Sequence, residues 1–70
     1  MNSLGYKTAL ATLNMTHAHA AELFDVHLKT SRRWANGARV PREIEIVLQM
    51  MIHYRLSVHD VLKNIRVRKN

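Results

Sequence analysis

Short polar joints, together with glycine and proline, divide this chain into five short helical windows. Both glycines and the single proline lie at Gly5, Gly37 and Pro41, and neither a Gly/Ser-rich linker nor a repeat is present. Between the interruptions, apolar residues recur every three or four positions, as on one face of an amphipathic helix, and there is no strand signal. The pattern predicts one compact all-α domain over residues 1–70. Its expected helices lie near residues 4–13, 16–24, 28–36 and 41–55, with a fifth after Ser57.

Capping residues mark where several of these helices begin and end. Thr16 can accept a backbone N–H at the start of the second helix. Ser57 and Asp60 form an S-x-x-D box in which each side chain can bind the other's free backbone N–H. Asn36 and Gly37 are typical of a helix C-terminus, because glycine adopts the left-handed conformation without a Cβ clash. Residues 66–70 carry three positive charges and no partner, so a flexible basic tail is expected there.

The chain is small and strongly basic. Seventy residues bury only a small core, and without cysteine there is no disulfide or Cys-based zinc site, so we expect oligomerisation to add stability. Eleven Lys and Arg against five Asp and Glu give a net charge of +6, while 47% hydrophobic residues exclude a disordered basic tail. A compact domain with an anionic partner, nucleic acid or a membrane surface, is expected.

The same sequence predicts a cytoplasmic protein. The longest nearly apolar run, residues 46–52, falls far short of the roughly 20 residues that span a bilayer. Residues 1–15 contain one lysine and no long apolar block, unlike a signal peptide.

Five basic residues lie in a stretch from residue 27 to residue 42 that has no acidic residue. They are Lys29, Arg32, Arg33, Arg39 and Arg42. A run of charge is more often a solvated face than a binding site, but the position of this one matters. About three residues join the second and third helices, the length of the turn in a helix-turn-helix. With Trp34 facing inward, the first three basic residues lie on the outward side of the third helix, where a recognition helix keeps the side chains that contact DNA.

Residues 16–37 resemble the helix-turn-helix of the lambdoid phage repressor and Cro family, also called XRE-type. Matching features are the small Ala21, the apolar Val26 in the turn, the aromatic Trp34 and the Asn36-Gly37 end. Residues 56–62 resemble the family's final short helix, so the likeness covers roughly residues 7–65. Short members of the family include Cro-like repressors, antitoxins and anti-CRISPR-associated regulators, and the sequence does not choose among them.

Two positions depart from the family pattern. The turn usually has glycine where this chain has Asp25, and aspartate tolerates the left-handed conformation. Ser31 stands where the family usually has a buried valine or isoleucine. We expect its hydroxyl to bond back to the carbonyl of His27, four residues earlier.

The resemblance implies two sets of DNA-contacting residues. Contacts to base edges are expected from His27, Leu28, Lys29, Thr30, Arg32 and Arg33. Contacts to phosphates are expected from the free N–H groups of Thr16, His17 and Ala18, and from Asn36, Arg39 and Arg42. Lys29 and Arg33 are the strongest candidates for base reading because both can bond guanine O6 and N7, and phosphate contact alone is the alternative. For Leu28, contact with a thymine methyl and packing onto the turn stay open.

The fourth helix is apolar over more than half of its circumference. One stripe, expected to face the core, comprises Ile44, Val47, Leu48, Met51 and Ile52. Ile46, Met50 and Tyr54 extend the stripe to one side, and we expect them, with Val58 of the fifth helix, to face a second subunit. Cover by the fifth helix and the tail within one chain is the alternative. Residues 42–65 would then serve both core and dimerisation, and a C2 homodimer predicts a pseudo-palindromic operator.

No set of residues suggests catalysis, a metal or a cofactor. His17 and His19 lie on different helical faces, and His53 and His59 lie on separate helices. The chain has no Gly-rich phosphate loop and no paired carboxylates on one face. We therefore expect no enzyme, no metal, no cofactor and no small-molecule ligand.

The sequence predicts a sequence-specific regulator of transcription that binds double-stranded DNA as a dimer. The expected setting is a small repressor of a phage or other mobile element, acting in the cytoplasm of a prokaryotic cell or phage-infected host. The alternative is an antitoxin-type interaction module that binds a toxin and its own promoter. An RNA- or membrane-surface binder is disfavoured because its positive charges would follow one long helix face.

Overall fold

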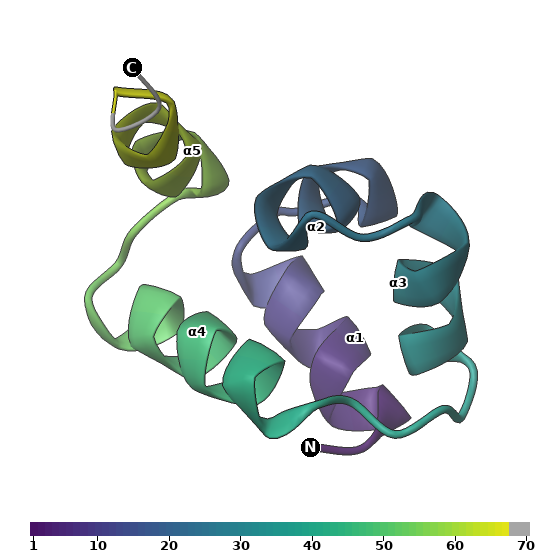
Figure 1. The fold of residues 1–70 in the computed structure, drawn as a ribbon. Coiled ribbons are helices and arrows are strands. Elements are labelled where there is room, and N and C mark those ends of the chain that lie inside the picture. Colours follow the sequence, from purple (N-terminus) through teal and green to yellow (C-terminus); the bar gives the residue numbers. More distant parts are fainter. Residues whose placement is uncertain (68–70) are drawn as a thin grey trace.

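The computed structural model describes residues 1–67 of the chain, which form five helices and no strand (Figure 1). The helices are α1 (Ser3–Thr12), α2 (His17–Phe24), α3 (Leu28–Ala35), α4 (Arg42–His53) and α5 (Val58–Val67). The all-α prediction is confirmed, and the predicted windows fall on these helices with small differences at their ends. The expected flexible tail is wrong at its start, because α5 continues through residues 66–67. The rest of that tail, residues 68–70, lies outside the described residues.

Two helices begin with the predicted caps. At α5, Ser57 N donates to Asp60 Oδ2 over 3.0 Å and Asp60 N donates to Ser57 Oγ over 3.1 Å. At α2, His19 N donates to Thr16 Oγ1 over 3.1 Å, as expected of a Thr cap. The structure adds the reciprocal bond, in which Thr16 N donates to His19 Nδ1 over 3.2 Å. Thr16 and His19 therefore form a full capping box.

All four connections between helices use the same local geometry. Each contains one residue with positive φ: Asn14 at 54°, Asp25 at 54°, Gly37 at 113° and Arg55 at 56°. The next residue in each case donates its N–H to the carbonyl five positions earlier, for example Val26 to Ala21 over 3.0 Å. This is the Schellman motif, which satisfies carbonyls at a helix C-terminus. The expected left-handed conformation of Asp25 is confirmed.

Trp34 joins three helices in the core. Its ring meets Tyr6 of α1 edge-on, with centroids 5.6 Å apart, and Phe24 of α2 at 6.4 Å. α1 lies between α3 and α4 and contacts both, while α2 contacts α3 and α5 (Figure 1). Through these contacts α1 packs on α3 on one side and on α4 on the other.

Of the stripe predicted to face the core, Ile44, Leu48 and Met51 of α4 are buried. Ile52 is 36% exposed, so its predicted place in the core is wrong.

The outer face of α4 stays open. Ile46, Met50 and Tyr54 are 45%, 53% and 63% exposed and line a shallow groove with Gln49 and His53. Within residues 1–67, α5 packs on α2 and leaves these three side chains exposed. The alternative in which the fifth helix covers them is therefore wrong for the described residues.

Val58 does not belong to this open face. The sequence placed it at a subunit interface, but its side chain is only 4% exposed within one chain. Val58 packs into the core of its own chain, so its predicted place at a subunit interface is wrong.

None of the helices within residues 1–67 is long and apolar enough to cross a membrane.

Candidate nucleic-acid interface

The α2–α3 unit is a helix pair with a three-residue connection. α2 ends at Phe24, residues 25–27 turn the chain, and α3 begins at Leu28. Asp25 makes the turn in the left-handed region, and Val26 is half-buried beneath it. The two helices contact each other, and α3 leaves the turn in a different direction from α2 (Figure 1). The turn thereby presents one complete side of α3 away from α2.

α3 has sharply different faces. Ser31, Trp34 and Ala35 are buried against the other helices. Leu28, Lys29, Arg32 and Arg33 are exposed, while Thr30 is half-buried. Positions 28, 29, 32 and 33 follow helical spacing, so the exposed residues form one strip along the helix. The predicted inward and outward assignment of Trp34 and the basic residues is confirmed.

Within residues 1–67, the exposed cations of α3 have no ion-pair partner. Among the residues that the structure describes, no carboxylate lies within ion-pair distance of Lys29, Arg32 or Arg33. Their charges are therefore available to an external anion.

Further exposed groups flank α3 on both sides. His27 precedes it, and Asn36, Arg39 and Arg42 follow it. Arg42 begins α4 near Glu45, whose pKa is lowered mainly by the hydrogen bond from the Met1 amine and further by the charge of Arg42. The positive charge of Arg42 therefore already interacts with the carboxylate of Glu45.

The first turn of α2 offers fewer free N–H groups than expected. Thr16 N donates to His19 Nδ1, so the prediction that this group is free is wrong. The N–H groups of His17 and Ala18 remain at the helix N-terminus, where backbone dipoles favour an anion. Ala18 is exposed and His17 is half-buried.

Ser31 departs from its predicted hydrogen bond. Its Oγ lies 2.7 Å from the Tyr6 hydroxyl and 2.7 Å from His17 Nδ1, so its partners come from α1 and α2 rather than from the His27 carbonyl. Burial raises the pKa of Tyr6 above its ordinary 10.0, and the hydrogen bond with Ser31 opposes part of that rise. Sequence reasoning missed both partners. The available signal was the phenol of Tyr6 in an apolar stripe, because a buried tyrosine hydroxyl requires a partner.

A contact between two histidines joins α2 to α5. The rings of His19 and His59 meet at an angle of 62° with centroids 6.2 Å apart. His19 Nδ1 accepts from a backbone N–H, so neutral His19 carries its proton on Nε2. Among the described residues no group of three or more His, Cys, Asp or Glu side chains is placed to hold a metal ion, and this contact packs α5 against α2.

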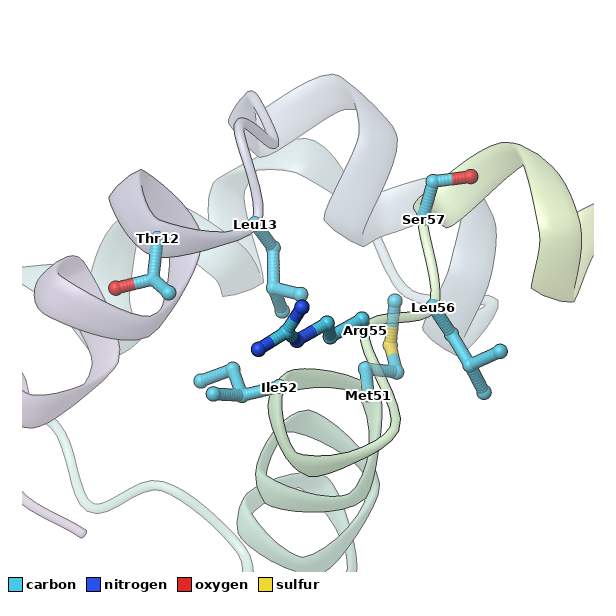
Figure 2. Close-up of a pocket in the computed structure, with 7 residues that line it drawn as sticks. All are labelled: Thr12, Leu13, Met51, Ile52, Arg55, Leu56 and Ser57. Carbon is cyan, nitrogen blue, oxygen red and sulfur yellow. The ribbon is translucent and has the colours of Figure 1, made fainter.

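A second hollow lies between α1 and the α4–α5 connection (Figure 2). Arg55 extends across it between Leu13 and Ile52. Its other lining residues are Thr12, Met51, Leu56 and Ser57. Arg55 is the one charged side chain among these lining residues.

Comparison with protein-family models, curated proteins and solved structures finds no match for this chain.

Proposed function

We propose that this protein is a sequence-specific regulator of transcription that inserts α3 into the major groove of double-stranded DNA. In this proposal α2 and α3 form a helix-turn-helix. The observation that carries it is the exposed strip of Leu28, Lys29, Arg32 and Arg33 on a helix whose other face is anchored by Trp34. The resemblance of residues 16–37 to the phage repressor and Cro family supports the same assignment.

Base reading is assigned to the exposed face of α3 and its first turn. Arg33 and Lys29 suit guanine, since both can donate to O6 and N7 in the major groove. Arg32 lies beside them, and His27 and Thr30 are at the edge of the same face. Leu28, 39% exposed, is assigned to contact with a thymine methyl, with packing onto the turn as the alternative.

Phosphate contacts are assigned to the flanks of the reading face. The N–H groups of His17 and Ala18 would hold one backbone, and Asn36, Arg39 and Arg42 would hold the other side. These contacts set the orientation of the protein on DNA and carry little sequence information.

A C2 dimer through the outer face of α4 completes the proposal. Ile46, Met50 and Tyr54 are exposed, and their groove is otherwise lined by Gln49 and His53. No charged Lys, Arg, Asp or Glu lines it, so two chains of net charge +6 can meet there without bringing like charges together. Such a dimer would place two copies of α3 about 34–36 Å apart, one DNA turn, on a pseudo-palindromic operator.

Selection of preferred DNA from a random pool, followed by two arginine variants, tests the proposal. We expect a palindromic winner. Arg33→Ala should then cost about 1–3 kcal/mol and relax preference at one base pair of each half-site. Arg39→Ala should weaken binding to all sequences alike and make the salt dependence shallower. Lys7→Ala is the matched control, because Lys7 is an exposed cation on α1 outside the α2–α3 unit.

Two results would overturn the assignment. A pool that yields no preferred sequence contradicts specific binding. Equal losses for Arg33→Ala and Arg39→Ala on every DNA contradict base reading by Arg33.

The exposed apolar face of α4 also favours a second candidate, an antitoxin-type module in which this face binds a toxin. The oligomeric state separates the two. A chain that stays monomeric at high micromolar concentration, both alone and on DNA, leaves the α4 face to a different protein.

A further inference from the structure

Three polar side chains, one each from α1, α2 and α3, form one hydrogen-bond chain. Tyr6 of α1 and Ser31 of α3 are fully buried, and His17 of α2 is half-buried. The Tyr6 hydroxyl lies 2.7 Å from Ser31 Oγ, and Ser31 Oγ lies 2.7 Å from His17 Nδ1. The positions of the protons in this chain follow from counting donors and acceptors.

The count begins at the buried end. Tyr6 has one O–H, and its hydrogen-bond partner among residues 1–67 is Ser31. A buried O–H without an acceptor is strongly disfavoured, so Tyr6 donates to Ser31. Ser31 must then donate its own proton to His17 Nδ1, the other atom bonded to it. Nδ1 therefore carries no proton, and neutral His17 holds its proton on Nε2.

The opposite tautomer does not satisfy the same contacts. A proton on Nδ1 would make His17 a second donor to Ser31. The proton of Ser31 or that of Tyr6 would then be buried without an acceptor. Because burial raises the pKa of Tyr6, the phenol stays protonated and its demand for an acceptor persists.

Nε2 of His17 is not fully buried. It has no hydrogen-bond partner among the described residues, and none of their buried side-chain nitrogen or oxygen atoms lacks a partner. An unpartnered Nε2 is therefore not a buried atom. The ring itself is steadied by stacking on Tyr6, with centroids 6.4 Å apart and an angle of 26°. The imidazole of His17 is thus held by a hydrogen bond at Nδ1 and by stacking of its ring face on Tyr6.

We propose that Tyr6 and Ser31 hold His17 as its Nε2–H tautomer, and that this N–H donates to a DNA phosphate oxygen at the first turn of α2. Tyr6 and Ser31 are positioning residues, because they act through His17. The phosphate contact rests on the proposed DNA-binding function, whereas the tautomer belongs to the free protein. Nε2–H would join the backbone N–H groups of His17 and Ala18 in one set of donors.

The tautomer is tested on free protein by NMR of the imidazole nitrogens, recorded with the rings in their neutral form. We expect a single Nε2–H tautomer at His17, and the ordinary mixture at exposed His27 in the same spectrum. Ser31→Ala should return His17 to that mixture. An Nδ1–H tautomer at His17, or the same ratio at His17 and His27, overturns the proposal. The wild-type comparison decides this even if Ser31→Ala does not fold.

The phosphate contact is tested with two variants of His17 whose folding is verified by circular dichroism. His17→Gln places an amide donor near the position of Nε2, whereas His17→Asn places its polar group near Nδ1 and leaves nothing at Nε2. We expect His17→Gln to bind DNA more tightly than His17→Asn. His17→Asn should bind several-fold more weakly on every sequence, because a phosphate contact carries little sequence information.

The outcomes separate this contact from the proposed function. Wild-type affinity for both variants overturns the phosphate contact and leaves DNA recognition by α3 in place. If wild-type protein binds no DNA, the proposed function and the phosphate contact both fall, while the NMR result still decides the tautomer.

Discussion

Removing the hydroxyl of Ser31 should destabilise the protein more than removing the hydroxyl of Tyr6, although each change breaks the same 2.7 Å hydrogen bond. The asymmetry follows from the direction of that bond. In Ser31→Ala the Tyr6 O–H remains, fully buried, with no acceptor among the described residues. In Tyr6→Phe no donor is stranded, because Ser31 still donates to His17 Nδ1.

The expected costs follow from these two situations. A buried donor left without a partner costs about 1–3 kcal/mol, which is the expected loss for Ser31→Ala. Loss of an ordinary hydrogen bond costs about 0.5–1.5 kcal/mol, which is the expectation for Tyr6→Phe. The double variant strands no hydroxyl, so its cost should be close to that of Tyr6→Phe alone. His17 adds little in any variant, since it is half-buried and water can reach its ring.

Urea unfolding followed by Trp34 fluorescence measures these differences. Trp34 is the single tryptophan, it is buried, and its ring packs edge-on against Tyr6. All variants must be compared at one protein concentration, because self-association would shift the midpoint. Equal losses for the two single variants that add in the double variant would refute the assigned direction of the chain.

Local geometry supports further predictions. Asp25→Ala should destabilise the fold by about 1 kcal/mol because alanine is disfavoured at φ 54°, whereas Asp25→Gly should be neutral or stabilising in the same urea assay. Ser57→Ala should cost about 1 kcal/mol through loss of the α5 cap. Hydrogen bonds from the backbone and then the side chain of Ser57 lower the pKa of Asp60 below its ordinary 3.8. The ionised carboxylate of Asp60 therefore stabilises the fold above pH 3.8, and this contribution is lost as the pH falls through the lower pKa of the folded state. Asp60→Asn should make unfolding less dependent on pH in that acid range. Met50→Lys should shift sedimentation toward the monomer and weaken binding to a palindrome more than to a half-site, and an unchanged dimer would contradict the proposed interface.

Most of the helices could be predicted because the signals that define them are local. The Ser57–Asp60 box closes within four residues, and the left-handed residue after each of α1 to α4 is followed by a hydrogen bond spanning five. The two faces of α3 were also predictable, since Trp34 sets the inward direction and helical spacing then places Arg32 and Arg33 outside. His19 as the partner of Thr16 was within reach of the same reasoning, but histidine is an unusual residue at that position of a capping box.

The sequence by itself determined a small, basic, five-helix domain with one basic helix face, because periodicity, caps and turns act over a few residues. Only the tertiary structure decided which surfaces meet. Apolar periodicity says that a face is buried without saying against what, so Val58 proved to be part of the protomer's own core and the face of Ile46 stayed open. The partners of Ser31 lie 14 and 25 residues away in the chain, and they meet it because α1 and α2 pack on α3. A buried hydroxyl needs a partner that is close in space, whatever its distance in the sequence. For Ser31 these partners are Tyr6 of α1 and His17 in the first turn of α2.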